Sequence, residues 1–325
     1  MSKSSFKVLV TEPITGPFLD ELEKFCEVKV GNRGDFLTEE SLIYALDDIN
    51  GLLCLLTNPV SEKVVNSAKK LKIIANMAVG YNNIDIQAAE KNGIIVTNTP
   101  DVLTEATAEL TIGLIFATAR KFSASEQFLR DGKFDIWDPF GHLGMQLSGK
   151  TLGIIGMGKI GFSVAQKAHA LGMNICYHNR KPVEEKAKSV NATFFDSLDE
   201  LITHSDVISL HCPLTDETHH LLRTEHFEKM RESSILINTS RGPVVDEAAL
   251  AEALHSGQIA GAGLDVFEEE PRVHPDMLTA PNTVLLPHIG SATHQTRKEM
   301  ARLSYEAIIH IAKEKNPSEL SNRVC

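Results

Sequence analysis

The sequence predicts an α/β protein with two doubly wound domains, each built around a parallel sheet. Short apolar runs bounded by turn residues alternate with segments of helical spacing along most of the chain. This alternation is typical of βα units in parallel sheets. The chain has 325 residues, which suits two domains of ~150 residues each. The rhythm breaks near Pro100 and starts again at Thr151, so we expect one domain on each side of that break.

The first half supplies five expected strands, each followed by a helical segment or a turn. The strands are FKVLVTE, CEVKVG, GLLCLLT, KIIANMAVG and GIIVTNTP. The helices are PFLDELEKF, TEESLIYALD, SEKVVNSAKKL and NIDIQAAEKNG. After NTPDVLTEAT we expect one long helix of about two dozen residues, ending at Arg130. A glycine- and proline-containing loop with the only tryptophan, Trp137, follows it.

The second half supplies a complete series of its own. Its expected strands are TLGIIGMG, MNICYHN, ATFFD, DVISLHCP, SSILINTS, GAGLDVF and TVLLPHIG. Roughly six or seven strands suffice for a doubly wound sheet. The last amphipathic helix, at about residues 293 to 314, is therefore surplus to this domain and could return to the first one.

Composition excludes several classes of partner. The formal net charge of −11 argues against nucleic acid as the main partner. The N-terminal MSKSSFKVLV lacks a signal-peptide core, and the most apolar helix, which carries Glu109, is too short to span a bilayer. We therefore expect no membrane association and a cytoplasmic protein. The five cysteines form no CxxC pair, which favours buried thiols in a reducing compartment.

Histidine and cysteine spacing gives no support for a metal enzyme. The 13 histidines form no HExxH motif and no compact Cys/His cluster. The adjacent His219 and His220 lie in what we interpret as a helix-like surface segment. The prediction is therefore that no metal is bound.

The stretch TLGIIGMGKIG contains the most specific local motif. Gly156, Gly158 and Gly161 form GxGxxG directly after an apolar strand and before a helix. The first glycine allows a tight turn, the second a close approach of backbone to pyrophosphate, and the third close helix–strand packing. The helix N-terminus that follows would attract the phosphates. The alternative is a packing turn with no ligand.

The end of the next strand, CYHNRK, predicts the choice of dinucleotide. Asn179 lies 23 residues after Gly156, where an acid would bind the ribose hydroxyls of NAD(H). Arg180 and Lys181 would instead attract a 2′-phosphate. We therefore expect NADP(H) to be preferred, with NAD(H) possible. An ordinary solvated basic turn is the alternative.

Three further stretches follow apolar strands of the second half: LINTSRG, GLDVFEEEP and LLPHIGSAT. They place Arg241, Asp265, Glu270 and His288 at the carboxyl edge of the sheet, where ligands bind in such folds. Histidine suits proton donation to the alkoxide formed when a hydride reduces a ketone, and a carboxylate would orient its ring. Arginine suits a substrate carboxylate. Singly, each has a structural alternative, such as a capping Arg or a His in a satisfied loop.

Taken together, these motifs resemble the D-isomer-specific 2-hydroxyacid dehydrogenase family. NMAVGYNNID, NTPDVLTEATAE, GKTLGIIGMGKIG, LHCPLTDETHHLL, INTSRG, GLDVFEEEP and LPHIGSAT occur in the same order and cover essentially the whole chain. The branch that it resembles most is that of the glyoxylate/hydroxypyruvate reductases. The resemblance implies a Rossmann cofactor domain at residues 101–288, inserted into a discontinuous flavodoxin-like substrate domain at 1–100 and 289–325. It also implies a cleft between the domains and a homodimer supported by the long helix and the tryptophan loop, although that loop could instead cover only its own domain.

The resemblance also implies roles for individual residues. Arg241 would hold the substrate carboxylate and carbonyl, His288 would be the general acid in reduction, and Glu270 would pair with His288. The register of Glu270 rests on the family's E–P step, and Glu268 and Glu269 would then be ordinary exposed charges. Substrate-binding residues would also include Leu55, Val79 and Gly80. The expected cofactor-binding residues are Thr107, Gly156, Met157, Gly158, Lys159, Ile160, Gly161, Asn179, Arg180, Lys181, Cys212, Pro213, Thr218, Thr239, Ser240, Asp265 (near the nicotinamide amide) and Gly290.

The leading hypothesis is NADPH-preferring reduction of a small 2-keto acid, glyoxylate or hydroxypyruvate, to the D-2-hydroxy acid. A 2-ketogluconate reductase would need the same Arg–Glu–His set and the same cofactor. A D-3-phosphoglycerate dehydrogenase is less favoured because no regulatory domain follows residue 314. A dinucleotide-sensing transcriptional co-repressor on this fold is the alternative outside the enzymes.

Overall fold

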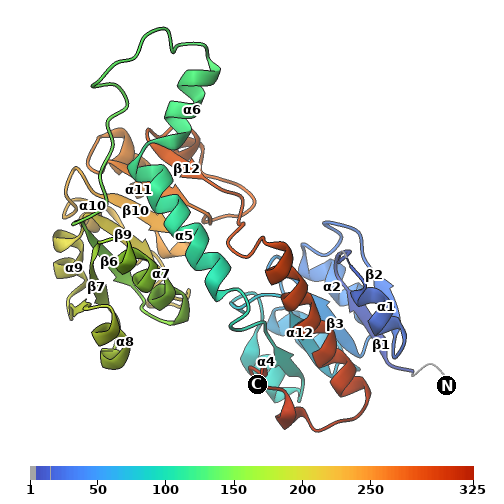
Figure 1. Ribbon diagram of the computed structural model, residues 1–325. Coiled ribbons are helices and arrows are strands. Elements are labelled where there is room, and N and C mark those ends of the chain that lie inside the picture. The colour runs from blue at the N-terminus through green and yellow to red at the C-terminus, as the bar shows by residue number, and fades with distance from the viewer. Residues whose placement is uncertain (1–4, 15) are drawn as a thin grey trace. The chain divides into compact units, whose positions relative to one another are not determined.

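The computed structural model describes residues 5–14 and 16–325 of the chain. The chain divides into two compact units, here called unit 1 (Met1–Leu103 and Ala292–Cys325) and unit 2 (Thr104–Ser291). Unit 1 therefore ends its first segment at 103 rather than 100, and resumes after 291 rather than 288. Both units contain an all-parallel sheet (Figure 1), and unit 2 is inserted into unit 1, so the predicted fold class is confirmed.

Unit 1 is built on a five-stranded sheet of order β2-β1-β3-β4-β5. This is the flavodoxin-like order. Its strands are β1 (Lys7–Val10), β2 (Glu27–Val30), β3 (Gly51–Cys54), β4 (Ile73–Asn76) and β5 (Ile95–Thr97). Its helices are α1 (Phe18–Glu23), α2 (Glu39–Ala45), α3 (Glu62–Ser67), α4 (Ile86–Lys91) and α12 (His294–Ala312), followed by the 3₁₀ turn η3 (Pro317–Glu319). Helix α12 packs on β3, β4 and α1, so the surplus C-terminal helix completes unit 1.

Unit 2 is built on a seven-stranded sheet of order β12-β11-β10-β9-β6-β7-β8. Its strands are β6 (Thr151–Ile155), β7 (Asn174–His178), β8 (Thr193–Phe194), β9 (Val207–Leu210), β10 (Ile235–Asn238), β11 (Gly261–Leu264) and β12 (Thr283–Leu285). Counted from β6, this is the Rossmann order 3-2-1-4-5-6 with one more strand beyond the sixth. The order reverses between β6 and β9, which is where a dinucleotide binds in such sheets.

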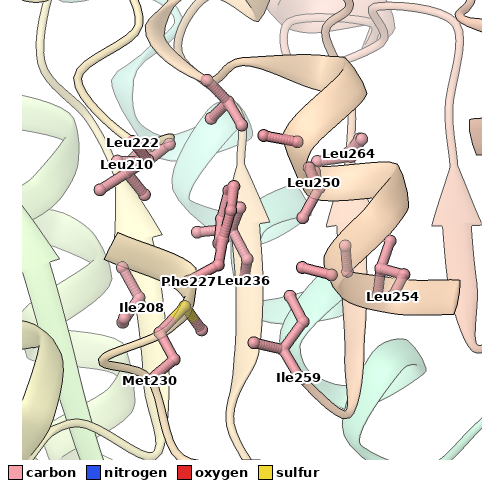
Figure 2. Close-up of a cluster of buried hydrophobic side chains, with 14 of the residues drawn as sticks. Ile208, Leu210, Leu222, Phe227, Met230, Leu236, Leu250, Leu254, Ile259 and Leu264 are labelled. Atoms are coloured by element: carbon pink, nitrogen blue, oxygen red, sulfur yellow. The ribbon is translucent and has the colours of Figure 1, made fainter. Parts of the chain in front are cut away.

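Helices cover both faces of the unit 2 sheet. They are α5 (Thr104–Ala119), α6 (Phe122–Arg130), α7 (Lys159–Ala170), α8 (Glu184–Ser189), α9 (Leu198–His204), α10 (Thr224–Phe227) and α11 (Glu247–His255), with the 3₁₀ turns η1 (Gly242–Val244) and η2 (Pro275–Leu278). Strand β10 is fully buried. Its successive side chains therefore enter two different cores, one on each face of the sheet. Ile235 and Ile237 join the core formed with α5 and α7, whereas Leu236 joins the core formed with α10 and α11. Figure 2 shows that second core, in which Phe227 and Leu250 pack beside Leu236.

The single long helix expected before Arg130 is two helices, which corrects that prediction. Helix α5 ends at Ala119, and α6 starts after Lys121, whose φ is +54°. The carbonyl of Ala119 accepts the N–H of Met145 at 2.7 Å, so a distant segment ends the helix where the local sequence has neither glycine nor proline. No helix in the described residues is long and apolar enough to cross a membrane.

Candidate active site

The glycine loop between β6 and α7 has the geometry that dinucleotide binding requires. Gly156 has φ +94°, and a Cβ there would lie 2.7 Å from the backbone nitrogen of Cys212. A Cβ on Gly161 would lie 2.4 Å from the Gly156 carbonyl oxygen. A Cβ on Gly158 would meet nothing within 4 Å, so backbone is open to a ligand at that point. These residues fit a pyrophosphate at the N-terminus of α7, because the N-terminal end of a helix attracts anions.

The end of β7 is tied to the glycine loop. The side-chain oxygen of Asn179 accepts the N–H of the buried Met157 at 2.7 Å, and the N–H of Gly156 donates to the His178 carbonyl at 3.0 Å. Asn179 thus positions the loop. Arg180 and Lys181, which follow it, are exposed at this edge of the sheet.

Lys186 is a third cation beside the loop that the sequence analysis missed. Its Nζ lies 5.5 Å from the centroid of the Phe162 ring and 3.5 Å from the Gly158 carbonyl oxygen. The only available signal was its place in the helix after the basic cluster, a position that surface lysines commonly occupy. Lys159 and Ile160, also expected to bind cofactor, form the first turn of α7.

The turn after β9 lies directly against the glycine loop. Burial raises the pKa of the Cys212 thiol to about 11. The Thr218 hydroxyl donates to the Pro213 carbonyl at 2.6 Å and accepts the N–H of Thr215 at 2.8 Å, so Thr218 holds this turn in shape. Cys212 thus lies beside Gly156, at the end of a neighbouring strand.

Helix α5 and the end of β10 meet through hydroxyl groups. The hydroxyls of Thr111 and Thr239 lie 2.9 Å apart, and Thr111 also donates to the Thr107 carbonyl at 2.8 Å. Ser240 donates through both its N–H and its hydroxyl to the side-chain oxygen of Asn238. These contacts bring Thr107, Thr239 and Ser240, all expected at the cofactor, to one edge of unit 2.

Asp265 is buried beneath the loop that carries His288. Its two carboxylate oxygens accept the N–H groups of Ile289 and Gly290, each at 2.7 Å. Burial raises the pKa of Asp265, and these two hydrogen bonds oppose that shift. A Cβ on Gly290 would lie 3.1 Å from Asp265 and 3.5 Å from Thr107, so these three residues are neighbours. Asp265 therefore fixes the backbone on the C-terminal side of His288, whose own φ is +55°.

The three residues predicted to carry the chemistry come together in unit 2. Nδ1 of His288 lies 2.8 Å from Oε2 of Glu270, and Oε1 of Glu270 accepts the N–H of Phe267 at 3.0 Å. A Cβ on Gly242, the residue after Arg241, would lie 1.9 Å from the Phe267 carbonyl oxygen. The Arg241 loop is therefore in direct contact with the segment that bears Glu270, and only glycine fits there.

The charges of this trio influence one another. Burial alone would raise the pKa of Glu270, but the hydrogen bond to His288, the charge of His288, the Phe267 N–H and the charge of Arg241 together lower it. Burial lowers the pKa of Arg241, and the Glu270 carboxylate opposes that shift. Glu270 is therefore ionised near neutral pH, beside two groups that favour its negative charge.

The two neighbouring acids differ from each other, and the prediction that both are ordinary exposed charges is wrong for Glu268. Glu269 is exposed and lies 3.5 Å from Arg272. Glu268 is half-buried, with Oε1 2.6 Å from Nε2 of His220 and Oε2 accepting the N–H of Glu247. The predicted helix-like segment around His220 is also wrong, because that segment is a turn. Local sequence did not show either contact, since the partners are 48 and 21 residues apart.

The expected substrate-binding residues of the first half lie in unit 1, after the carboxyl ends of β3 and β4. Leu55 donates its N–H to the side chain of Asn58 at 2.8 Å. The carbonyls of Val79 and Gly80 accept side-chain N–H groups of Asn98 and Asn76 at 2.9 and 3.0 Å. Amide side chains therefore hold both loops in place.

Helix α6 and the loop that follows it expose an apolar surface of unit 2, and both extend away from its sheet in Figure 1. Helix α6 has no buried residue. The exposed apolar residues of this segment are Phe122, Leu129, Phe134, Ile136, Trp137, Phe140 and Leu143. Trp137 is 73% exposed, which shows that the tryptophan does not cover the surface of its own unit.

Fold and site together define an oxidoreductase that uses a nicotinamide dinucleotide. The sequence pattern described as "D-isomer specific 2-hydroxyacid dehydrogenase, NAD binding domain" matches residues 112–290. The glyoxylate reductase of Thermococcus litoralis is 44% identical over 321 residues, which are 98% of this chain and 97% of the relative. The chain belongs to the D-isomer-specific 2-hydroxyacid dehydrogenase family.

Two solved structures are similar to this chain over nearly all of its length. The TT0316 protein of Thermus thermophilus is 42% identical with a TM-score of 0.90, and the match covers 98% of this chain and 100% of that one. The NADPH-dependent glyoxylate/hydroxypyruvate reductase of Sinorhizobium meliloti, solved with NADP and malonate, is 34% identical with a TM-score of 0.83. That match covers 94% of this chain and 93% of the other.

Proposed function

We propose that this chain reduces small 2-keto acids, glyoxylate and hydroxypyruvate, to D-2-hydroxy acids, with NADPH as the preferred cofactor. The observation that carries the chemistry is the His288–Glu270 pair at 2.8 Å beside the Arg241 loop. The substrate class is supported by two of the relatives named above, a glyoxylate reductase and a glyoxylate/hydroxypyruvate reductase.

The reaction needs an anchor for the substrate and a proton for the new alcohol. The bound dinucleotide supplies the hydride. Arg241 binds the substrate carboxylate and polarises its carbonyl, because its guanidinium forms two parallel hydrogen bonds in a fixed geometry. Glu270 accepts from Nδ1 of His288, and the doubly protonated imidazolium of His288 passes its Nε2 proton to the forming alkoxide, which leaves a neutral imidazole with its proton on Nδ1. In the oxidation of a hydroxy acid, the same Nε2 accepts the proton instead.

The remaining assignments form part of the same proposal. Leu55, Val79 and Gly80 bind substrate, together with Arg241 and His288. The cofactor is bound by the glycine loop, the Cys212–Pro213 turn and the group formed by Thr107, Asp265 and Gly290. Because both Asp265 oxygens already accept backbone N–H groups, its role toward the nicotinamide amide works through the position of the 288–290 loop as much as through direct contact.

The NADPH preference rests on the charges at the end of β7. Arg180 and Lys181 are exposed there, and Lys186 lies beside Gly158. A 2′-phosphate on the adenosine ribose would gain charge-assisted hydrogen bonds from this group, whereas a ribose hydroxyl would gain little. The relative from Sinorhizobium meliloti is named as NADPH-dependent and was solved with NADP.

We also propose that the protein is a homodimer assembled through helix α6 and the tryptophan loop. Seven large apolar side chains are exposed along this one segment, and such a concentration of exposed apolar residues is typical of association sites. Replacing Trp137 and Phe140 with serine should give monomers in sedimentation velocity. If the double variant sediments as the parent does, another surface forms the dimer or there is none.

Initial rates of cofactor oxidation test the substrate and cofactor proposals together. The acceptors are glyoxylate, hydroxypyruvate and 2-ketogluconate, each with NADPH and with NADH. We expect kcat/KM to favour NADPH by about tenfold or more, ~1.4 kcal/mol of discrimination. A best rate with 2-ketogluconate would move the chain to that branch, and preference for NADH would make the basic stretch a solvated turn.

Matched variants identify the residues responsible for the cofactor preference. Arg180→Ala and Lys181→Ala should raise the KM for NADPH and leave that for NADH nearly unchanged. Lys188→Ala is the control, because Lys188 is exposed on α8 and 3.8 Å from Glu184. An equal effect of all three variants on NADPH would indicate general electrostatic attraction instead of a phosphate site.

A further inference from the structure

A cluster of three metal-binding side chains lies outside the reaction site described above. His219 and His220 come from the turn after β9, and Glu268 comes from the loop after β11. One nitrogen from each histidine and one Glu268 oxygen lie within 4.8 Å of one another. The two imidazole rings are stacked, with centroids 4.1 Å apart and an angle of 28° between their planes. Their nitrogens can therefore point toward a common ligand.

Two of the three side chains are held in place by the surrounding backbone. The N–H of His220 donates to the Pro243 carbonyl at 2.8 Å, and its φ is +48°. Leu222, two residues later, is fully buried and donates to the Val244 carbonyl at 3.1 Å. Glu268 exchanges hydrogen bonds with Glu247: its N–H donates to the Glu247 carboxylate at 2.8 Å, and its Oε2 accepts the Glu247 N–H at 3.2 Å.

The third side chain, His219, is exposed. It can adjust its position to a ligand without moving the core beneath it. The site therefore combines a fixed pair, His220 and Glu268, with one movable histidine. Zinc binds nitrogen and carboxylate oxygen at ~2.0–2.2 Å. The 2.6 Å contact between His220 and Glu268 would open slightly as the ion replaces the shared proton.

The charge around the cluster favours a cation. Glu247 is buried, and its carboxylate accepts the N–H groups of Glu268 and His274 at 2.8 and 2.9 Å. A dication at Glu268 would offset this buried negative charge. The Glu247 N–H on Oε2 also orients the Glu268 carboxylate, which is the usual task of a group behind a metal ligand.

We propose that His219, His220 and Glu268 form a binding site for Zn²⁺ that joins the 215–222 turn to the 266–274 loop. Two imidazoles and one carboxylate form a known zinc donor set, with water in the fourth position. Imidazole selects zinc, copper or nickel over Mg²⁺ and Ca²⁺, which prefer all-oxygen ligands. The ion stabilises unit 2, because binding to the folded state alone favours that state. This inference does not depend on the proposed reductase activity.

Zinc titration of the full-length, chelator-treated protein tests the site. Competition against a chromophoric zinc chelator should show one high-affinity site per chain, unchanged by a large excess of Mg²⁺. His219→Ala and Glu268→Gln should each weaken that binding at least tenfold. His169→Ala is the matched control, because His169 is an exposed histidine of α7 outside the cluster.

A second histidine–carboxylate pair must be separated from this one. His288→Gln should leave the zinc titration unchanged if the cluster is the site, and should abolish it if zinc binds at His288 and Glu270. Thermal unfolding gives an independent measurement: Zn²⁺ should raise the Tm of the parent and of His288→Gln but not of His219→Ala. Absence of a stoichiometric site in the parent, or equal zinc binding by His219→Ala and His169→Ala, would overturn the proposal.

Discussion

Two histidine–carboxylate pairs of unit 2 lie at hydrogen-bonding distance, and their acids are two residues apart in the chain. His288 pairs with Glu270 at 2.8 Å, and His220 pairs with Glu268 at 2.6 Å. The four side chains are similarly half-buried, between 24% and 31% exposed. Pair geometry and burial alone therefore do not distinguish the two.

The surroundings of the pairs do differ. Glu270 is close enough to Arg241 for that charge to lower its pKa, and the backbone beside His288 is held by Asp265. His220 instead stacks against His219, and Glu268 bonds to the backbone of Glu247. A cation that can bind a carboxylate substrate lies beside the first pair, and a second imidazole lies beside the other. The neighbours decide which chemistry the same pair supports.

The largest expected effect is on the turnover rate, which should distinguish His288 from His220. His288→Gln should lower kcat by about 10²–10⁴-fold, because the general acid is lost. Binding of NADPH, followed by fluorescence, should be nearly unchanged. His220→Gln, which removes the corresponding histidine of the other pair, should leave kcat close to that of the parent. Equal losses of kcat in the two variants would show that the two pairs do not differ in function and that both serve only the fold.

The next effect tests the role of Arg241. Arg241→Lys should raise the substrate KM about ten- to a hundredfold, since a point charge cannot replace a two-pronged hydrogen bond to a carboxylate worth ~1.5–3 kcal/mol. Steady-state kinetics with glyoxylate measure this directly. An unchanged KM would mean that another group anchors the substrate.

A smaller effect concerns the two acids and the pH dependence of the rate. The lowered pKa of Glu270 shows that its carboxylate and a charged His288 stabilise each other. Glu270 keeps its charge to a pH below its ordinary range, and Glu270→Gln removes this titrating group, so the acidic limb of the pH profile of the rate should change. Glu268→Gln should leave the profile in place. A changed pH profile in Glu268→Gln but not in Glu270→Gln would show that Glu268, and not Glu270, is the functional partner of His288.

The smallest effect is on stability. Because the pKa of Glu270 is lowered by folding, its charge adds stability above its ordinary value of 4.5, and that stability is lost as the pH falls through the lower, folded value. The midpoint of urea unfolding should therefore be higher for the parent than for Glu270→Gln at pH 7. The difference should shrink as the pH falls below 4.5 and through the lower pKa of the folded state. A difference that is constant with pH would mean that packing, not charge, is responsible.

Much of the fold could be predicted from the sequence because buried parallel strands are continuous apolar runs that turn residues interrupt. The same alternation predicted that a last helix would be left over after the second sheet. The break between α5 and α6 could not be predicted, because its cause is the N–H of Met145, on a loop that returns to Ala119. A contact between segments that are distant in the chain has no signal in the local sequence pattern.

The candidate site also has some features that could be predicted from the sequence and others that could not. The glycine loop is a local motif, and its geometry follows from its own residues and the next strand. The half-buried position of Glu268 and its contact with His220 depend on segments 21 and 48 residues away. The direct approach of Gly242 to Phe267 is of the same kind, although the small residue after Arg241 was a signal that could have been used.

The return of helix α12 to unit 1 has a consequence for biosynthesis. Residues 104–291 of unit 2 are contiguous, so its entire sheet is synthesised, and emerges from the ribosome, ahead of α12. Strands β3 and β4, made early, must wait for α12 to cover one of their faces. We therefore expect the later-made unit to reach its native state first during synthesis, while the N-terminal sheet exposes apolar surface that chaperones can bind until the final segment emerges.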